Sequence, residues 1–244
     1  MIKLNSSFGY TKVKPTEKTR LVQNVFSDVA KNYDLMNDLM SFGAHRVWKK
    51  KFTEIINPKN NETIIDIGSG TGDIAINILK NKFNGNLHLL DLNKEMLNIG
   101  KNRINKRNNV FFHHGNAEKL KFKNNYFDKY TIAFCLRNIT NIEKSIKEAL
   151  RVLKPGGSYY CLEFSSPNSF LSTSIYNNYK SRLLPFLGKI IAKNEKAYEY
   201  LSESIDLFPN QEKLKFLLEL NGFTNVSYLD LFDGIVSVHK GYKI

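Results

Sequence analysis

Apolar residues recur at helical spacing early in the chain. Side chains three and four residues apart lie on one face of a helix, so this spacing predicts a helix over residues 21–33. Its apolar members are Leu21, Val22, Val25, Phe26, Val29, Ala30 and Tyr33. Residues 34–43 break this pattern. A second helix, rich in basic residues, is expected from about His45 to Ile56 and ends before Pro58.

After Pro58, short apolar runs typical of buried strands alternate with segments typical of helices. The predicted strands cover residues 63–67, 87–91, 110–114, 128–135 and 157–164. The predicted helices cover residues 73–80, 94–104, 142–153 and 211–220. Two last strands, at 226–231 and 235–239, are expected to close the sheet as an antiparallel pair. The alternation predicts an α/β fold with a seven-stranded, mostly parallel sheet that carries helices on both faces.

The length of 244 residues suits one sizeable α/β domain and is short for two. Residues 1–18 are polar and show no period, so we expect a flexible arm there. Residues 19–244 are expected to form a single domain, with a helical cap over 19–57. An irregular helical insert, interrupted by Pro185 and Gly188, is expected over 168–208 on the substrate side.

A glycine-rich turn follows the first strand of the predicted sheet, in the sequence Asp66-Ile67-Gly68-Ser69-Gly70-Thr71-Gly72. Without a Cβ atom, the backbone can turn sharply and approach a ligand closely. The dinucleotide fingerprint is G-x-G-x-x-G. Here the spacing is G-x-G-x-G, with the acid Asp66 two residues before the first glycine, and it resembles the S-adenosylmethionine (SAM) loop of class I methyltransferases.

Polar residues follow other predicted strands, and ligands of such sheets bind outside the carboxyl ends of the strands. Asp91 lies 21 residues beyond Gly70 and suits the ribose diol of a nucleoside. Asn116 could read adenine with its amide, while the small Ala117 leaves room for the ring; the alternative for Asn116 is a turn residue. Arg137 is either a charged group beside the methyl donor or a surface ion-pair residue.

Composition limits the partners and the compartment. Thirty-six lysines and arginines against 23 acids give a net charge of +13, which attracts nucleic acid or anionic lipid. The basic residues are scattered among asparagines, so the charge is weak evidence for either partner. No apolar run reaches the 18 residues of a membrane-spanning helix. Cys135 and Cys161 fit neither a disulfide framework nor a metal spacing, which favours a reducing cytoplasm. His113 and His114 lack a third ligand, so no metal site is predicted.

Several blocks of sequence resemble the UbiE family of quinone C-methyltransferases, over about residues 8–243. Two of them, residues 33–43 and Leu136-Arg137-Asn138, are much more specific than the glycine loop. The others are residues 25–32, 116–118, 151–157, 162–165, 198–205 and 234–243.

The resemblance implies a class I SAM-dependent methyltransferase with a Rossmann-like sheet and an N-terminal helical cap. Its expected reaction is methylation of a ring carbon of 2-polyprenyl-6-methoxy-1,4-benzoquinol in ubiquinone synthesis, of demethylmenaquinol in menaquinone synthesis, or of both. The cofactor positions of the family fall on Thr71, Asp91, Asn116 and Ala117.

The resemblance also implies residues on the quinol side. The pair thought to lie beside the quinol falls on Arg137 and Asn138, and a tyrosine near the site falls on Tyr33. Cys135 stands where the family usually has glycine, and its bulkier thiol would narrow the approach to the methyl donor.

Ring methylation needs a proton acceptor, because an aromatic carbon is a weak nucleophile until an adjacent hydroxyl is deprotonated. Most of the rate gain should come from alignment and from stabilisation of the phenolate, a role that suits Arg137. Tyr33, His45 or a water held by Arg137 could accept the proton.

The polyprenyl tail of such a substrate must lie in a groove or stay in the bilayer. The apolar insert at 175–191 and the basic helix at 45–51 would suit peripheral contact with the inner face of a membrane. Alternatively, the apolar residues of the insert simply pack on the sheet. A homodimer and a quinone-biosynthesis complex are further candidate partners.

Other functions stay open at this point. A basic class I methyltransferase could act on RNA or on another small aromatic compound, but the chain shows no added RNA-binding module or stacking platform. A catalytically silent scaffold is the non-enzymatic alternative, and the intact loop and Asp91 argue against it. Titration with SAM would separate the scaffold from the enzyme.

Overall fold

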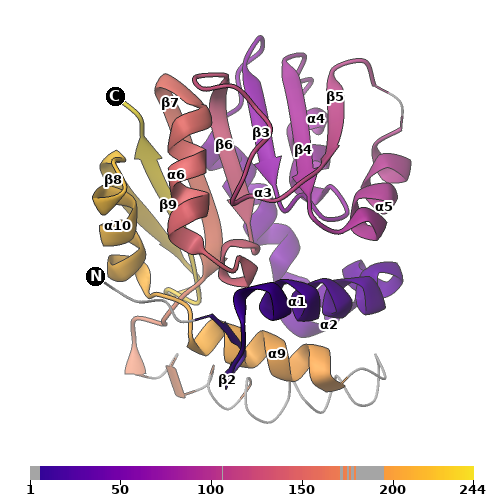
Figure 1. The fold of residues 1–244 in the computed structure, drawn as a ribbon, viewed down its shortest axis with the longest axis vertical. Coiled ribbons are helices and arrows are strands. Elements are labelled where there is room, and N and C mark those ends of the chain that lie inside the picture. Colours follow the sequence, from indigo (N-terminus) through magenta and orange to yellow (C-terminus); the bar gives the residue numbers. More distant parts are fainter. Residues whose placement is uncertain (1–5, 106, 171–172, 175, 177–178, 180–194) are drawn as a thin grey trace.

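A seven-stranded sheet runs through the computed structural model (Figure 1), which describes residues 6–105, 107–170, 173–174, 176, 179 and 195–244. In spatial order the strands are β5 (Val110–His114), β4 (Asn86–Asp91), β3 (Thr63–Ile67), β6 (Phe127–Ala133), β7 (Leu153–Phe164), β9 (Val236–Tyr242) and β8 (Thr224–Leu231). The first five are parallel, whereas β9 pairs antiparallel with both β7 and β8. The predicted fold class is therefore confirmed, including the antiparallel pair at the end of the chain.

The strand register aligns the carboxyl ends of the parallel strands. Ile67 of β3 lies opposite Leu90 of β4 and Ile132 of β6. Leu90 in turn lies opposite His113, and Ile132 lies opposite Cys161. The loops that follow these residues therefore start from one edge of the sheet, where ligands bind in open α/β folds.

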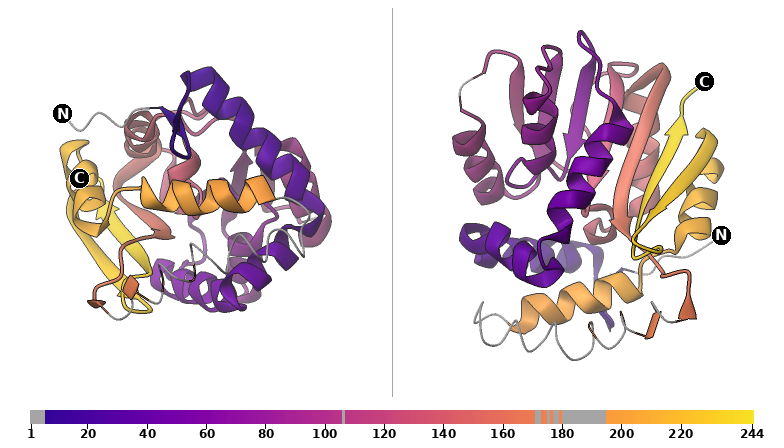
Figure 2. Two further views of the ribbon diagram at one scale, coloured as in Figure 1. Left: turned by 90° about the horizontal axis from the view of Figure 1, so that it is seen from below. Right: turned by 180° about the vertical axis from the view of Figure 1, so that it is seen from behind.

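Helices cover both faces of the sheet (Figures 1 and 2). They are α6 (Ile142–Val152) and α10 (Gln211–Leu220) on one face, and α3 (Ala44–Ile56) and α4 (Asp73–Lys80) on the other. Fully buried Ile146 and Leu217 pack on the first face, and Phe52 and Ile78 pack on the second. Helix α5 (Lys94–Ile104) contacts β4 and β5. The rigid framework is thus a sheet between two helical layers.

Three helices lie across the carboxyl edge of the strands: α1 (Pro15–Val29), α2 (Tyr33–Ser41) and α9 (Glu195–Asp206) (Figures 1 and 2). A 3-10 turn, Ala30–Asn32, joins α1 to α2. Val29 of α1 and Tyr198 of α9 are buried in one small cluster. These helices form the cover over the binding edge.

Residues 1–18 were expected to form a flexible arm, and the structure places regular elements within their described part. Helix α1 begins at Pro15, a residue whose fixed φ favours the first helical turn. Before it, β1 (Ser7–Phe8) and β2 (Thr11–Lys12) form a small antiparallel hairpin. The ring of Phe8 stacks on Tyr200 of α9 at 4.3 Å. The polar composition of this segment gave no prediction of a hairpin, because its contacts are with α9, which is far away in the sequence.

The stretch 34–43, which was expected to break the helical pattern, contains α2. Met36 and Met40 are four residues apart and pack against the cluster of Val29 and Tyr198. The helix ends where Phe42 adopts a left-handed φ of 48°. Its many Asp and Asn residues lower helix propensity, and tertiary packing overrides that preference.

Helix α3 differs from the expected cap helix because its apolar side packs on the sheet. Trp48, Phe52 and Ile56 are buried there. Lys49 is also buried, at 8% exposure, and forms an ion pair with Asp73. Only part of the predicted basic face of residues 45–51 is therefore available to a membrane.

The predicted insert at 168–208 is described only in part. Helix α9 forms its end, and Tyr176 and Tyr179 are placed beside α2, where the Tyr179 hydroxyl donates to the Met40 carbonyl. Pro185, Gly188 and most of the apolar pattern lie outside the described residues.

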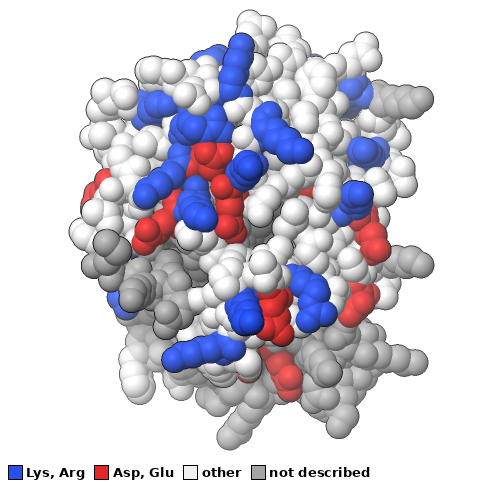
Figure 3. Space-filling model, in the orientation of Figure 1, with Lys and Arg blue, Asp and Glu red and all other residues white. Residues whose placement is uncertain are grey.

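On the face shown in Figure 3, charge is spread rather than concentrated. Lysines and arginines lie among acidic side chains there. Arg151, for example, forms an ion pair with Glu148 at 2.7 Å. A continuous basic track, which nucleic acid would require, is absent from this face. Within the described part of the chain, we find no helix with the length and hydrophobicity needed to cross a bilayer.

The adjacent histidines of β5 have different partners, because successive side chains of a strand point to opposite faces. His113 Nε2 lies 3.0 Å from His88 Nδ1, and His114 Nε2 lies 3.0 Å from the Leu92 carbonyl. Burial, with a smaller contribution from His113, lowers the pKa of His88 to about 4. Burial likewise lowers the pKa of His239 to about 4.

We expect the contribution of His88 and His239 to the free energy of unfolding to fall as the pH drops from about 6.5 to about 4, against the opposite contribution of Asp66, whose pKa is raised. In this range the unfolded chain binds protons at His88 and His239 that the folded chain does not, which costs about 2–3 kcal/mol for each histidine. Denaturant titrations at several pH values measure the slope. His88→Phe should flatten it and the exposed-site control His114→Gln should not; equal slopes in all three proteins would contradict the assignment.

Candidate active site

The glycine loop between β3 and α4 adopts a conformation that side chains disfavour. Gly68, Gly70 and Gly72 have φ values of 61°, 52° and 88°. A Cβ atom on Gly68 would lie 2.1 Å from the Cys135 sulfur, and one on Gly72 would lie 2.9 Å from Ile104 Cδ1. Glycine is therefore required here both by backbone conformation and by close packing.

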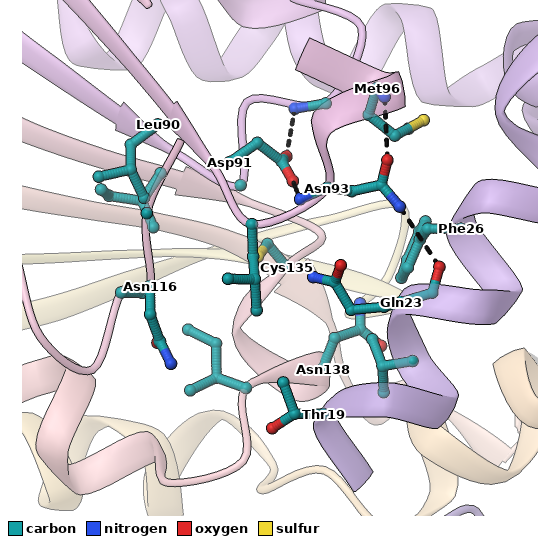
Figure 4. Close-up of a pocket in the computed structure, with 18 of the residues that line it drawn as sticks. Thr19, Gln23, Phe26, Leu90, Asp91, Asn93, Met96, Asn116, Cys135 and Asn138 are labelled. Carbon is teal, nitrogen blue, oxygen red and sulfur yellow. Dashed lines mark hydrogen bonds between the residues drawn. The ribbon is translucent and has the colours of Figure 1, made fainter. Parts of the chain in front are cut away.

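Asp91 is the last residue of β4 and its side chain contacts the glycine loop (Figure 4). Its Oδ2 accepts a hydrogen bond from the Gly70 amide at 2.8 Å, and its Oδ1 accepts one from the Asn93 amide at 2.7 Å. Burial raises the pKa of Asp91, and the amide hydrogen bonds oppose that rise. Each oxygen keeps a second lone pair, so the fixed carboxylate can still accept from two hydroxyl groups.

A cavity of about 810 Å³ opens beside Asp91 and the loop. Leu90, Asp91, Asn116 and Cys135 line it from the sheet, and Figure 4 shows side chains of α1 facing them across the space. The α1 residues are Thr19, Val22, Gln23 and Phe26. The predicted front helix therefore forms one wall of this cavity.

Asn93 connects α1 to the carboxyl edge of the sheet through hydrogen bonds. Its Oδ1 caps α5 by accepting from the amides of Glu95 and Met96, each at 3.0 Å. Its Nδ2 donates to Ser27 Oγ at 2.9 Å and to the Gln23 carbonyl at 3.3 Å. This role was not predicted from the sequence, although an Asn directly before a predicted helix is a capping signal.

Asn116 is a turn residue that also lines the cavity. Its Oδ1 accepts from the Glu118 amide at 2.8 Å, as a turn asparagine does. Asn116 and Ala117 nevertheless line the cavity together. Because the oxygen is engaged in the turn, the Nδ2 group is the part of Asn116 available to a ligand.

Asp66 and Thr71 line a smaller adjoining cavity of about 360 Å³ rather than the first one. Both cavities include Gly68, Gly70 and Tyr33 in their walls. Asp66 Oδ1 accepts from Thr131 Oγ1 at 2.8 Å. Within the described structure, Asp66 Oδ2 and Ser69 Oγ are buried and have no hydrogen-bond partner. Burial raises the pKa of Asp66 to about 7.

A polar network ties the N-terminal helices to the loop. Lys49 Nζ lies 2.6 Å from Asp73 Oδ2, and Arg103 Nη1 lies 2.9 Å from Asp73 Oδ1. The same Arg103 atom lies 3.3 Å from Asp34 Oδ2 and donates to the Thr71 carbonyl at 2.9 Å. The Thr71 hydroxyl donates to Asp34 Oδ1 at 3.2 Å. Thr71 therefore connects α2 to the glycine loop.

A second, largely apolar cavity of about 1280 Å³ lies beside the first. Its side chains come from α2, α3, α9 and the loops after β6, β7 and β8. They include Trp48, Phe134, Phe164, Tyr176, Tyr179, Leu201, Ile205, Phe232 and Ile235. Tyr33 and Phe134 line both cavities, so the two spaces meet at these rings.

Arg137 and Asn138 are adjacent in sequence but serve different cavities. Arg137 lines the apolar cavity, and its Nη1 donates to Glu163 Oε1 and to the Phe134 carbonyl, both at 2.7 Å. This ion pair is buried, with 7% and 1% of the two side chains exposed. Asn138 lines the first cavity, and its Oδ1 accepts from the Tyr200 hydroxyl at 2.9 Å.

Glu163 is the most important partner that was not predicted from the sequence. It is fully buried in β7, where an acid among apolar residues is costly unless it is paired. Burial raises its pKa, and Arg137 and two backbone amides oppose that rise. The signal in the sequence was a single acid in the apolar run of residues 158–164.

The sheet order, the glycine loop and the carboxylate at the next strand define a class I SAM-dependent methyltransferase. A family model described as the ubiE/COQ5 methyltransferase family matches residues 11–243, and the chain belongs to this family. It is similar to the ubiquinone/menaquinone biosynthesis C-methyltransferase UbiE of Rickettsia prowazekii, with 48% identity over 98% of this chain and 99% of the relative. The predicted family and the predicted class of enzyme are confirmed.

Solved structures agree on the fold. A SAM-dependent methyltransferase from Thermotoga maritima superposes with a TM-score of 0.65 at 21% identity, covering 91% of this chain and 100% of that one. A phosphoethanolamine N-methyltransferase from Haemonchus contortus, in complex with S-adenosylhomocysteine, gives a TM-score of 0.61 at 17% identity, covering 80% and 52%.

The residues present fit SAM. A nucleoside needs a hydroxyl acceptor, which Asp91 supplies, and a close backbone, which the glycine loop supplies. The amino-acid end of SAM carries an ammonium and a carboxylate, and Asp66 and Ser69, each with one buried oxygen that has no partner in the described structure, line the adjoining cavity. A buried polar group without a partner is costly, so a ligand that satisfies both oxygens is favoured there.

We expect Gly68→Ala to lower the free energy of unfolding by more than Gly156→Ala. Both glycines have positive φ, which costs alanine about 1–2 kcal/mol, but a Cβ on Gly156 meets nothing within 4 Å. The additional loss at Gly68 comes from contact with the Cys135 sulfur.

Denaturant unfolding of the single and double variants measures this contact. Measured against Cys135→Gly alone, Gly68→Ala should cost no more than Gly156→Ala costs in the wild type. If Cys135→Gly gives no recovery, the sulfur contact is not what requires glycine at residue 68.

Proposed function

We propose that the chain transfers the methyl group of SAM to a ring carbon of a polyprenylated quinol, in the synthesis of ubiquinone, menaquinone or both. The observation that carries this proposal is the meeting of two cavities at Tyr33 and Phe134. One cavity has the polar groups of a nucleoside site. The other has the aromatic and aliphatic walls that suit an apolar ring with a tail.

The polar cavities hold SAM in this proposal. Asp91 accepts hydrogen bonds from the ribose diol, Asn116 donates to adenine, and Ala117 leaves space for the ring. Asp66 receives the ammonium group at the amino-acid end, while Thr71 keeps the glycine loop tied to α2. When bound, SAM supplies an electrophilic methyl group on a sulfonium.

Arg137 stabilises the negative charge that develops on the quinol oxygen. Its guanidinium is held from behind by Glu163 and the Phe134 carbonyl through one nitrogen, Nη1. Its Nε is buried and has no partner within the described structure, so it can still donate to an oxyanion. Tyr33 forms the wall between the two substrates. Asn138 acts on the SAM side of the same junction.

The tail of the quinol leaves through the open end of the apolar cavity. Phe42 and Phe232 line that cavity and are 76% and 55% exposed, and Val47 on α3 is 56% exposed. Helix α3 also exposes the cations Arg46 and Lys50 near Val47, and exposed apolar residues together with such cations suit contact with the interface of an anionic membrane. The proposed membrane contact therefore involves these exposed apolar residues as well as the basic residues of α3.

Purified protein is expected to transfer labelled methyl from SAM to a benzoquinol, to a naphthoquinol or to both. The assay uses each reduced quinone, with a short prenyl tail, as acceptor. An RNA substrate serves as the comparison. Transfer to neither quinol would contradict the proposed function.

Loss of the Arg137 guanidinium is expected to reduce turnover about 100-fold or more, with SAM affinity nearly unchanged. Arg137→Ala alone leaves Glu163 buried and unpaired, which costs about 3–5 kcal/mol of stability. The double variant Arg137→Ala/Glu163→Gln removes both charges and separates catalysis from folding. Calorimetry measures SAM binding, and comparable turnover with intact binding would remove Arg137 from the mechanism.

Phe42→Ser/Phe232→Ser is expected to weaken flotation of the protein with phosphatidylglycerol-containing vesicles severalfold, because it removes apolar surface from the contact. Phe216→Ser is the matched control, since Phe216 on α10 is 53% exposed and lines none of these cavities. Vesicles of phosphatidylcholine alone test the contribution of charge. If the Phe42→Ser/Phe232→Ser variant and the Phe216→Ser control both float like the wild type, the membrane does not contact Phe42 and Phe232.

A further inference from the structure

His45 lies on the wall of the apolar cavity with one ring nitrogen engaged and the other free. The residue is on α3 and is 5% exposed. Its Nε2 lies 2.9 Å from Asp38 Oδ1. Its Nδ1 is buried and has no partner within the described structure.

The partner of Nε2 determines the tautomer. Arg46 donates to both oxygens of Asp38, from Nε to Oδ1 and from Nη2 to Oδ2, each at 2.6 Å. The Arg46 guanidinium holds the pKa of Asp38 well below its usual range. An ionised carboxylate only accepts hydrogen bonds, so Nε2 carries the proton of a neutral His45. Nδ1 therefore carries a lone pair, and no group of the described structure donates to it.

Burial keeps His45 neutral at pH 7. Burial lowers its pKa, and so does Lys49 one helical turn along α3. Asp38 of α2 and Asp73 of α4 act in the opposite direction without cancelling the decrease. Arg46 is tied to Asp38 in a bidentate pair on the other side of the carboxylate.

The other ionisable groups of the cavity are poor proton acceptors. Burial raises the pKa values of Tyr33, Tyr176 and Tyr179, so these hydroxyls keep their protons at neutral pH. Arg137 stays charged. Lys49 is ion-paired with Asp73. Among the described residues of this wall, His45 is the one with a neutral nitrogen lone pair.

We propose that His45, oriented by Asp38, is the general base that takes the proton of the quinol hydroxyl next to the carbon to be methylated. The inference rests on the proposed function and names its proton acceptor. The O–H bond breaks, its electron pair stays on the quinol oxygen, and Nδ1 becomes protonated. After methyl transfer the ring carbon loses its own proton to solvent and the imidazolium returns its proton to the oxygen. One proton thus leaves the site in each turnover.

Asp38 is a positioning residue in this scheme. Its carboxylate fixes the tautomer that exposes Nδ1 and stabilises the imidazolium that forms. In Asp38→Asn the amide can donate to Nε2, which favours the opposite tautomer and blocks Nδ1. That variant should lose kcat with little change in KM for the quinol, and its pH profile should change.

The test compares wild type, His45→Ala and His45→Gln in the labelled-methyl assay. We expect kcat of both variants to fall about 10²- to 10⁴-fold, with SAM affinity by calorimetry within about twofold of wild type, since His45 does not line the SAM cavity. Added imidazole should restore part of the activity of His45→Ala. His88→Phe, which changes a histidine outside both cavities, is the control and should be fully active and unaffected by imidazole.

The pH profile gives the second measurement. The wild-type kcat/KM should fall on the acid side with a midpoint below 6.5, the ordinary histidine value, because protonated His45 cannot accept a proton. This limb should be absent from His45→Gln.

The outcomes are distinguishable. Wild-type transfer with undiminished activity in His45→Ala overturns the inference and leaves the proposed function intact. The inference is also overturned if imidazole does not rescue His45→Ala and the residual activity of His45→Gln keeps the acid limb. If the wild type methylates neither quinol, the proposed function fails and the inference fails with it.

Discussion

The parallel register of five strands is the constraint on which the site depends. Because Ile67, Leu90 and Ile132 lie in one row across the sheet, the loops that follow them start at the same edge. The glycine loop and Asp91 are thereby brought within hydrogen-bonding distance, 2.8 Å from the Gly70 amide to the carboxylate. A shift of one residue in this register would turn every side chain of the strand to the other face and separate these groups.

Two kinds of surface meet at this edge, and the residues between them are aromatic. The first cavity presents hydrogen-bonding groups, whereas the second is mostly apolar. Two cations in the wall of the second cavity, Arg137 and Lys49, are paired with Glu163 and Asp73. Buried ion pairs add little net stability, because desolvation offsets their attraction. In the proposed reaction these pairs would hold charges in fixed positions where charge develops on the quinol oxygen.

The candidate site was predictable from sequence where the residues follow strands directly. Asp91, Asn116 and the glycine loop come immediately after apolar runs, and the rule for parallel sheets brings them together. Glu163 and Asn93 were missed, since their importance comes from partners distant in sequence, such as Arg137 for Glu163 at 2.7 Å. Such long-range pairing leaves no periodic signal in the chain.

The sequence by itself determined the fold class, the glycine loop and the family, because hydrophobic periodicity and short motifs are local properties of the chain. Only the tertiary structure decided that Arg137 and Asn138 face different cavities and that α3 buries Lys49 against the sheet. It also decided that the polar residues before Pro15 form a hairpin on α9. Each of these features depends on contacts between segments far apart in the chain. The energies of these contacts depend on burial and geometry, which a local sequence pattern does not reveal.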